Sequence, residues 1–297
     1  MNAGVPLGVQ FGSMSFSRRD LFRGAAAAIP LRTAFAASLP AIGVQLYTVR
    51  SIVEKEPAAT LKAIDEIGYR EAEATSGNLD KIWADLKQTR LKPVSVHIDN
   101  ALFKAENKDK LSSTIADVKG KGFTYAVYPY VPPAARHGAD TFKELADTLN
   151  RAGAECKKAG LKLCYHNHAF EFQQFGSQSG LEIMMDAIDK STVGLEMDVF
   201  WVSVGGHDPV ELLNKYKGRV DLLHVKDKAE GTPVQYNESV PKTAFKEAGK
   251  GTLDWSKVLK AANAAGVKHY FVEQDQTPGN PVDSLRVSYE YLHALKF

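Results

Sequence analysis

Three carboxylates and one imidazole in the second half of the chain are of the residue types that bind a divalent metal ion. Each follows a separate short run of apolar residues that is typical of a buried parallel strand. The four residues are Glu171, Asp198, His224 and Glu273. In a parallel β/α barrel the C-terminal ends of all strands open on one face, so residues that are far apart in the sequence meet there. We therefore predict that these four side chains bind one divalent ion.

The donor types restrict the choice of metal. Structural zinc sites favour Cys and His, whereas three carboxylates with one imidazole form a harder set that suits Mn²⁺ or Mg²⁺. We therefore expect Mn²⁺ or Mg²⁺, with Co²⁺ and Zn²⁺ as alternatives.

Other polar and aromatic residues end candidate strands or follow them closely. They are predicted to form the wall of a substrate pocket around the metal: Gln45, Tyr47, Glu73, His97, His168, Trp201 and Lys226. For a histidine the alternative is a hydrogen bond to a neighbouring carbonyl, and for Trp201 it is packing against the following helix. Lys226 is expected to bind a substrate oxygen or to stabilise a developing enolate. Glu196 has the same strand parity as Asp198, so it should face the barrel interior, where it needs a partner or supports the ligands.

Short apolar runs alternate with amphipathic stretches of ten or more residues, which is the pattern of βα units around a parallel sheet. The candidate strands span residues 42–47, 71–74, 93–97, 124–128, 161–166, 193–198, 220–224 and 269–273. The candidate helices span residues 57–67, 79–87, 111–119, 141–159, 181–188, 209–216, 255–265 and 281–295. Eight such pairs predict a protein of the α/β class with a single (β/α)₈ TIM barrel.

The longest irregular segment, residues 229–251, follows the seventh candidate strand. A loop of this length inside a compact barrel is usually functional. Gly249 and Gly251 lie at its end, but they lack the spacing of a P-loop and do not follow a strand. We therefore expect a turn into the next helix there, and not a phosphate site.

The N-terminus has the features of an export signal. Ser-Arg-Arg-Asp-Leu-Phe-Arg at 17–23 is a twin-arginine pattern, and a weakly apolar stretch and the small-residue site at 34–36 follow it. An Ala-rich first helix is the alternative, but Pro30 and Arg32 interrupt the apolar stretch. We predict a twin-arginine (Tat) signal over residues 1–36, a barrel domain over 37–297, and a periplasmic or otherwise exported location.

Removal of residues 1–36 would leave 297 − 36 = 261 residues, close to the roughly 250 of one α/β barrel. The remaining 37 − 4 = 33 basic and 35 − 1 = 34 acidic residues give a formal charge of −1, which provides no basic field for nucleic acid. No apolar run approaches the ~20 residues that span a bilayer, so no membrane association is expected after cleavage. Cys156 and Cys164 are expected to be buried and free.

From about residue 39 onward, the chain resembles the xylose isomerase-like TIM-barrel superfamily, whose members are often called sugar phosphate isomerases/epimerases. The segments that carry the resemblance lie at 43–50, 165–172, 222–227, 249–255 and 272–275. They are specific for the superfamily and not for one reaction.

The resemblance implies a set of roles. In ketose 3-epimerases of the superfamily, two Glu, one Asp and one His bind the metal that chelates the substrate's carbonyl and hydroxyl groups, and these roles map to Glu171, Asp198, His224 and Glu273. Glu171 and Glu273 would also act as the opposed acid and base. The chemistry is reasonable in itself, because a metal bound to both oxygens stabilises a cis-enediolate that carboxylates can protonate from either face.

The expected activity is a metal-dependent isomerisation or epimerisation of an unphosphorylated sugar or keto-sugar, since no phosphate-binding cluster is evident. Relatives by this resemblance include inosose and 3-dehydroshikimate dehydratases, so a lyase, dehydratase or hydrolase acting on a keto-glycoside is the alternative. An exported, non-catalytic carbohydrate-binding barrel is another. Phosphodiester cleavage would need more metal ligands and a basic DNA face. Barrel relatives often pair, so a homo-oligomer is compatible with the sequence.

Overall fold

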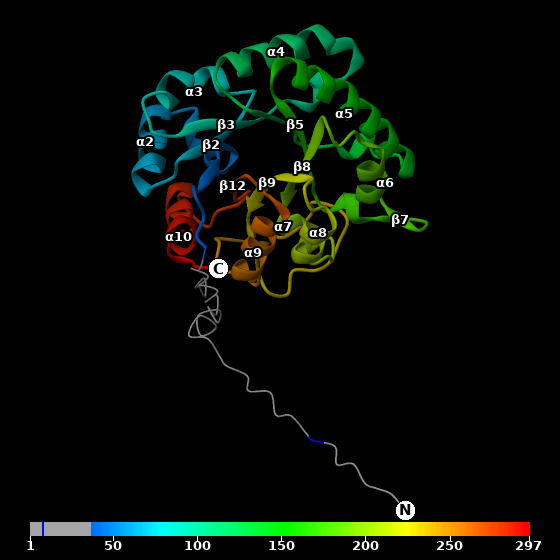
Figure 1. Cartoon of the computed structure of the whole chain (residues 1–297). Helices are drawn as coiled ribbons and strands as arrows, with labels where there is room; N and C mark the ends of the chain where they lie inside the picture. Colours follow the sequence, from blue (N-terminus) through cyan, green and yellow to red (C-terminus); the bar gives the residue numbers. More distant parts are fainter. Residues whose placement is uncertain (1–7, 9–36) are drawn as a thin grey trace, which may run out of the picture. The chain divides into compact units, whose positions relative to one another are not determined.

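A computed structural model of the chain describes residue 8 and residues 37–297 (Figure 1). Contacts between residues divide the chain into two units, Met1–Phe35 and Ala36–Phe297. The predicted export signal lies outside the described residues. Within the second unit, Ala37 lies beside the C-terminal residue Phe297, because the two exchange backbone hydrogen bonds of 2.7 and 2.9 Å.

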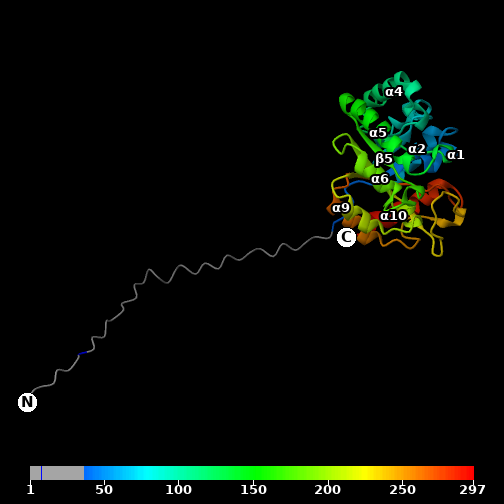
Figure 2. The same ribbon diagram turned by 90° about the vertical axis from the view of Figure 1, so that its right-hand side faces the viewer.

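Eight parallel strands close into one barrel, as predicted, and the helices lie around it (Figures 1 and 2). The barrel strands are β1 (Gly43–Gln45), β2 (Glu71–Thr75), β3 (Lys92–His97), β4 (Tyr125–Tyr128), β5 (Lys162–His166), β8 (Val193–Asp198), β9 (Val220–Val225) and β12 (His269–Val272). Neighbours around the barrel follow the order β1-β12-β9-β8-β5-β4-β3-β2. All strand C-termini therefore lie at the same end of the barrel.

Each predicted helix is present within a few residues of its expected bounds. The helices are α1 (Arg50–Val53), α2 (Pro57–Ile67), α3 (Leu79–Leu86), α4 (Lys108–Gly120), α5 (Ala139–Ala159), α6 (Gly180–Ala187), α7 (Val199–Val204), α8 (Pro209–Lys215), α9 (Trp255–Ala265) and α10 (Pro281–Ala294). Two short hairpins, β6 (Gln174–Phe175) with β7 (Gln178–Ser179) and β10 (Asp227–Lys228) with β11 (Phe245–Lys246), lie in the loops.

Local sequence signals set the helix ends. Helices α8 and α10 begin with proline. Proline lacks a backbone N–H, and at the first position of a helix that N–H would make no hydrogen bond within the helix. The preceding Asp208 and Asn280 cap them, since their side chains accept hydrogen bonds from Val210 N and Val282 N. Helices α5 and α9 end at Gly160 and Gly266 with φ of 79° and 92°, a left-handed conformation that favours glycine.

The barrel interior changes from apolar to polar along the strands. An apolar plug fills it, formed by Val94, Val127, Cys164, Leu222 and Phe271. Successive inward-facing residues of a strand are two apart, so the next ones after Cys164, Leu222 and Phe271 are His166, His224 and Glu273. The plug therefore separates this polar layer from the opposite end of the barrel.

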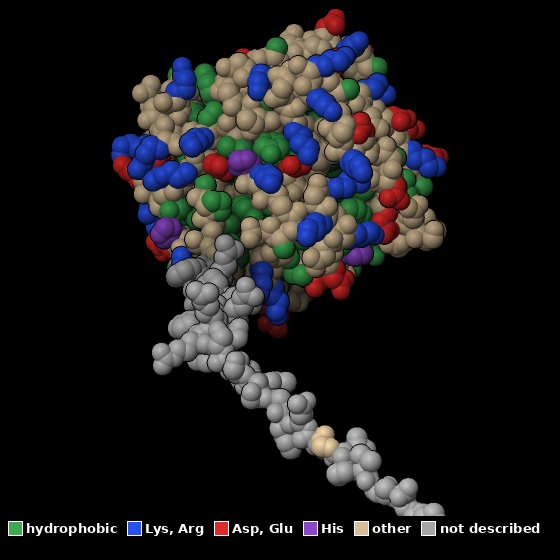
Figure 3. Space-filling view, viewed as in Figure 1, with side chains coloured by type: hydrophobic (Ala, Val, Ile, Leu, Met, Phe, Trp, Pro, Cys, Tyr) green, Lys and Arg blue, Asp and Glu red, His purple; other side chains and the backbone are tan. Residues whose placement is uncertain are grey.

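The surface carries both signs of charge. Lys and Arg side chains are interspersed with Asp and Glu over the face shown in Figure 3. Such mixing differs from the continuous basic face of many nucleic-acid-binding proteins. Within the described part of the chain, no helix combines the length and apolarity required to cross a membrane.

One carboxylate fixes the long segment that follows β9. Asp227 accepts hydrogen bonds from the backbone N–H groups of Gly249 (2.9 Å), Gly251 (3.2 Å) and Leu253 (3.1 Å) and from Trp255 Nε1 (2.8 Å). A buried carboxylate with several donors is strongly stabilised. The two ends of this segment are thereby joined at the C-terminal end of the barrel.

Gly251→Ala tests this attachment. An added Cβ would clash with the Asp227 carboxylate and with the Lys228 carbonyl oxygen, a backbone atom that cannot rotate away. We expect a loss of about 1–3 kcal/mol in the free energy of unfolding, measured by chemical denaturation. Gly279→Ala is the control, because no described atom lies within 4 Å of its added Cβ. Equal stability of the two variants would contradict this account.

Candidate metal centre

The strand ends bring two imidazoles and two carboxylates together. His166 and Asp198 are the last residues of β5 and β8, His224 lies on β9, and Glu273 follows β12. One nitrogen or oxygen of each lies within 4.8 Å of those of the other three. The separations include 3.0 Å from His224 Nδ1 to Glu273 Oε2, and 3.8 Å from Asp198 Oδ2 to both His224 Nδ1 and His166 Nε2. We call these four residues the Asp198 group.

The donors of the Asp198 group fit a divalent cation. Two imidazole nitrogens and two carboxylate oxygens form a mixed set that first-row transition metals bind. Asp198 Oδ2 is buried and accepts no hydrogen bond from any described residue, although Lys226 Nζ lies 2.9 Å away. Lys226 compensates part of the charge of this oxygen, whose remaining acceptor capacity could serve a metal ion. A metal ion is therefore compatible with the site.

Lys226 supplies a fixed positive charge beside this group. Its Nζ lies 2.6 Å from carboxylate oxygens of both Glu273 and Asp275, and its side chain is fully buried. Burial opposes the charge, but Asp198, Asp275 and Glu273 outweigh that effect and raise the pKa of Lys226 well above its usual value. Burial likewise opposes ionisation of Glu273, yet Lys226 and His224 hold its pKa well below the usual range. The two side chains thus form an ion pair.

Glu171 lies apart from the other three predicted ligands. It falls on a 3₁₀ helix (Phe170–Phe172) and belongs to neither metal-compatible cluster found among residues 37–297. Its carboxylate accepts hydrogen bonds from Tyr165 Oη (2.7 Å) and His168 N (2.9 Å). The structure therefore brings together Asp198, His224 and Glu273 but not Glu171, and His166 lies where a fourth ligand was expected.

A signal for His166 was present in the sequence. The candidate strand 161–166 ends at His166, just as the next one ends at Asp198, whereas Glu171 comes five residues after the strand end. The direction of a side chain beyond a strand end depends on the loop, and here the loop turns into the 3₁₀ helix. If only the last residue of each candidate strand were taken as a ligand, His166 would replace Glu171 in the predicted set.

A cavity of about 690 Å³ opens beside the Asp198 group. Of the predicted wall residues, Tyr47, His97, His168 and Trp201 line it. Gln45, Glu73 and Lys226 are not among the described lining residues, and each is buried. Gln45 Nε2 instead donates to Glu73 Oε1 at 2.7 Å. Further lining residues that the sequence did not suggest are Thr75, Asp99, Tyr130, Glu238 and Asp275.

The long segment after β9, which the sequence predicts to be functional, contributes to this cavity. Glu238, Val240 and Lys242 line the cavity. Arg136, in the β4–α5 loop, makes two hydrogen bonds of 2.8 and 3.2 Å to Glu238, and its guanidinium carbon lies 3.6 Å from the centre of the Phe170 ring. This contact joins loops that are about a hundred positions apart in the sequence, which no local pattern could predict.

The chain matches the model of one protein family. The model described as the xylose isomerase-like TIM barrel matches residues 61–294. The chain belongs to the xylose isomerase-like TIM barrel family. The resemblance inferred from the sequence motifs is confirmed.

Curated relatives and solved structures add detail about this family. An inosose dehydratase of Clostridium perfringens is 30% identical over 154 residues, 48% of this chain and 51% of that relative, so the chain spans about half the length of the curated relatives it matches. A sugar phosphate isomerase/epimerase of Parabacteroides distasonis has a TM-score of 0.72 at 24% identity, covering 87% of this chain and 95% of that one. The IolI protein, solved with a zinc atom, has a TM-score of 0.66 at 14% identity, covering 84% and 95%. The two structures establish similarity of fold.

The position of Glu171 leads to a prediction about pH. Burial raises its pKa from 4.5 to about 7, despite the hydrogen bonds from Tyr165 and His168. Below pH 4.5 this carboxyl is protonated in both the folded and unfolded states, so it has no effect there. Between pH 4.5 and 7 the unfolded state loses its proton first, so folding stability falls by about 1.4 kcal/mol per unit of pKa difference.

Glu171→Gln keeps an acceptor oxygen but cannot ionise. The wild type should therefore lose stability relative to Glu171→Gln as pH rises from 5 to 8, by a few kcal/mol. Urea denaturation of chelator-treated protein at several pH values measures this difference, with the exposed Glu106→Gln as control. Parallel stability curves for the wild type and Glu171→Gln would refute the prediction.

Proposed function

We propose that this protein is a divalent-metal-dependent lyase that eliminates a β-substituent, such as water, from an unphosphorylated keto-sugar or keto-polyol. The observation that carries this proposal is the Asp198 group at the wall of the cavity, beside the buried ammonium of Lys226. The similarity to inosose dehydratases over about half their length supports the dehydratase reading.

Four residues of the site would hold the metal ion. His166, Asp198, His224 and Glu273 would hold the ion, which would polarise the substrate's carbonyl and stabilise an enediolate. Two imidazoles make the donor set softer than the sequence alone suggested, so we favour Mn²⁺, Co²⁺ or Zn²⁺ over Mg²⁺. A zinc atom in the IolI structure is consistent with this choice.

Glu273 is the best-placed group for removing the substrate proton. It lines the cavity, and the charges of Lys226 and His224 overcome the effect of burial and keep it ionised. An ionised carboxylate at the cavity wall can accept a proton from the carbon next to a carbonyl, and a metal ion bound to that carbonyl would make the proton more acidic. The C–O bond on the next carbon would then break, and the leaving oxygen would take up a proton, for which the His97 imidazole lines the same cavity.

The position of Glu171 favours elimination over epimerisation. Epimerisation through an enediolate needs a second group that returns the proton to the opposite face, and by resemblance that group was Glu171. In the described structure Glu171 is absent from the cavity wall and is bonded to Tyr165 and His168. Elimination needs no proton returned to the same carbon.

Sugar isomerisation or epimerisation is the second candidate. His97 lines the cavity and could return a proton in place of Glu171. His168 also lines it, but burial and the nearby Lys226 lower its pKa well below 6.5 and leave it uncharged. The predicted export of the protein is a separate proposal, and it is compatible with both reactions.

Paired variants separate the two reactions. With an inosose or a keto-glycoside in deuterated water, proton NMR and mass spectrometry should reveal an unsaturated product that has lost its β-substituent. Glu273→Gln should lower kcat about 10²- to 10⁴-fold, whereas Glu171→Gln should retain activity within about tenfold. Chelation should abolish turnover, and added Mn²⁺, Co²⁺ or Zn²⁺ should restore it. An epimer that keeps all substituents of the substrate and gains one mass unit from a solvent deuterium would establish the epimerase instead, and its loss in Glu171→Gln would identify Glu171 as the second proton carrier.

The rim of the cavity suggests a substrate with more than one ring. Tyr47 lines the cavity with 42% of its surface exposed, and the Arg50 guanidinium lies 4.1 Å from its ring centre. An exposed aromatic face can pack on the apolar face of a sugar. Tyr47→Ala should therefore raise KM for a keto-disaccharide more than for a keto-monosaccharide. Tyr236→Ala is the control, since Tyr236 is equally exposed (42%) and is not among the described lining residues. An equal effect on both substrates would count against a second sugar site.

A further inference from the structure

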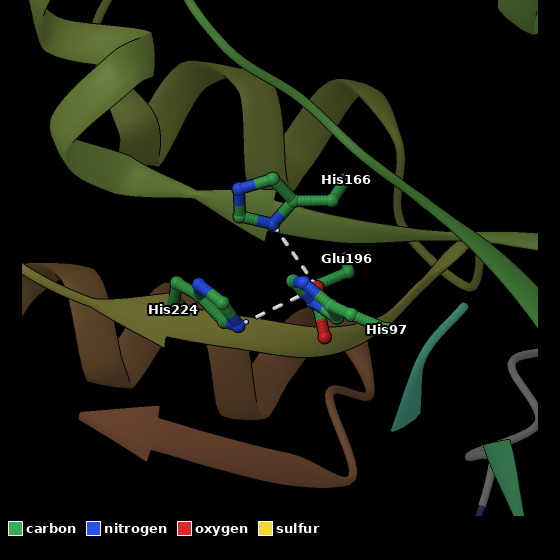
Figure 4. A group of neighbouring side chains, drawn as sticks. All are labelled: His97, His166, Glu196 and His224. Carbon is green, nitrogen blue, oxygen red and sulfur yellow. Dashed lines mark hydrogen bonds and ion pairs between the residues drawn. The ribbon is translucent and has the colours of Figure 1, made fainter. Parts of the chain in front are cut away.

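A second cluster of possible metal ligands shares two residues with the Asp198 group. It consists of His97, His166, Glu196 and His224, which Figure 4 shows converging inside the barrel. We call it the Glu196 group. Both groups need His166 and His224, so their roles must be decided from the individual ring nitrogens.

The two groups use opposite nitrogens of each shared ring. His166 directs Nε2 toward Asp198 Oδ2 (3.8 Å) and Nδ1 toward Glu196 Oε2 (3.0 Å). His224 directs Nδ1 toward Glu273 Oε2 (3.0 Å) and Nε2 toward Glu73 Oε1 (2.6 Å). Each ring therefore lies between the Asp198 group and a buried carboxylate.

This arrangement is the one that a metal-binding imidazole requires. A neutral imidazole that gives one nitrogen to a metal carries its proton on the other, and that N–H needs an acceptor. An ionised carboxylate is acceptor-only and fixes both the tautomer and the orientation of the ring. Glu196 and Glu73 are in position to do this for His166 and His224 respectively.

Other residues hold the two carboxylates in place. His97 Nε2 lies 2.7 Å from Glu196 Oε2 and 3.2 Å from Glu73 Oε1, so it bridges them. Gln45 donates a further hydrogen bond to Glu73, and both carboxylates are fully buried. Strands β1, β2, β3 and β8 thus support the imidazoles that β5 and β9 contribute.

A second metal ion in the Glu196 group is the alternative. It would need His166 Nδ1 and His224 Nε2 as ligands while their other nitrogens bind the first ion, which requires both rings to lose their remaining proton. The nitrogens of His97 and His166 are 2.7 and 3.0 Å from Glu196 Oε2, which are ordinary hydrogen-bond distances. Hydrogen bonds therefore account for Glu196 Oε2 without an ion, while Glu196 Oε1 is buried and has no hydrogen-bond partner among the described residues.

We infer that Glu196 and Glu73 are positioning residues that orient His166 and His224, and that one ion binds per chain, in the Asp198 group. This inference depends on the metal site of the proposed function. It makes no use of substrate turnover, so it can be tested by metal binding alone.

The experiment is a titration of metal-free, full-length protein with Co²⁺, followed by the visible absorption of the bound ion and by a competing chelator. The wild type should bind one Co²⁺ per chain. Glu196→Gln keeps the side chain's shape but replaces an acceptor oxygen with an NH₂ donor. It should still bind one ion, with affinity about 10- to 100-fold lower and a changed absorption spectrum. Asp198→Asn, which alters a ligand, should weaken binding further.

Glu71→Gln is the matched control. Glu71 pairs with His269 Nδ1 at 2.8 Å, and these are the first residues of β2 and β12, at the opposite end of the barrel. This variant also removes a carboxylate–imidazole pair, but it should leave Co²⁺ affinity and spectrum unchanged. If Glu196→Gln does not fold, Glu73→Gln tests the same inference through His224.

Several results would overturn the inference. They are two Co²⁺ ions per wild-type chain, an unchanged affinity in Glu196→Gln, or binding that is abolished by Glu196→Gln and retained by Asp198→Asn. A protein that binds Co²⁺ as expected but converts no keto-sugar would reject the lyase function and leave the positioning roles intact. A wild-type protein that binds no ion would reject both.

Discussion

The compensation of buried negative charge at the strand C-termini is the constraint on which the site depends. Asp198, Glu273 and Asp275 are gathered around one ammonium, that of Lys226, with contacts of 2.6 to 2.9 Å. Carboxylates this close repel one another, and burial removes the water that would screen them. Removal of one partner from such a cluster usually lowers the free energy of unfolding by about 3–5 kcal/mol, because the remaining charge is left uncompensated. Lys226 therefore preserves the geometry of the Asp198 group before any metal arrives.

The geometry of the barrel allows these charges to lie close together without disrupting its apolar core. Parallel strands direct alternate residues inward, so the apolar plug and the polar layer occupy successive levels of the same interior. The plug fills the barrel on the side away from the loops, while Glu238, bonded to Arg136, lines the cavity on the loop side. Electrostatic interactions among the buried side chains of the polar layer are stronger than in water. Rigid strands hold the ligands, and loops form the variable part of the wall.

The sequence predicted the fold closely because buried parallel strands are short continuous apolar runs and the surrounding helices are amphipathic. Helices α2 and α9 and strand β8 have the expected bounds. Asp198, His224 and Glu273 were predicted as ligands because they end candidate strands, and the structure brings them together. It places His166, and not Glu171, with these three, because a residue five positions beyond a strand takes its direction from the loop. The contacts of Glu196 and Glu73 with imidazoles on distant strands have no local pattern at all.

The environment of Glu171 is the basis on which we propose elimination and not epimerisation. Barrels of this kind differ in function through the loops that follow the strands, while the strand ends stay in place. In this chain the loop after β5 turns Glu171 toward Tyr165 and the His168 backbone, and burial raises its pKa to about 7. A carboxyl in that state is half neutral near pH 7 and has its oxygens engaged, so it is a poor partner for a carbanion across the cavity. The same loop leaves His166 at the strand end with Nε2 toward Asp198. In this chain the backbone direction after β5 thus leaves His166 beside Asp198 and His224 and keeps Glu171 out of the described cavity wall, which is why we connect the His166 site with elimination.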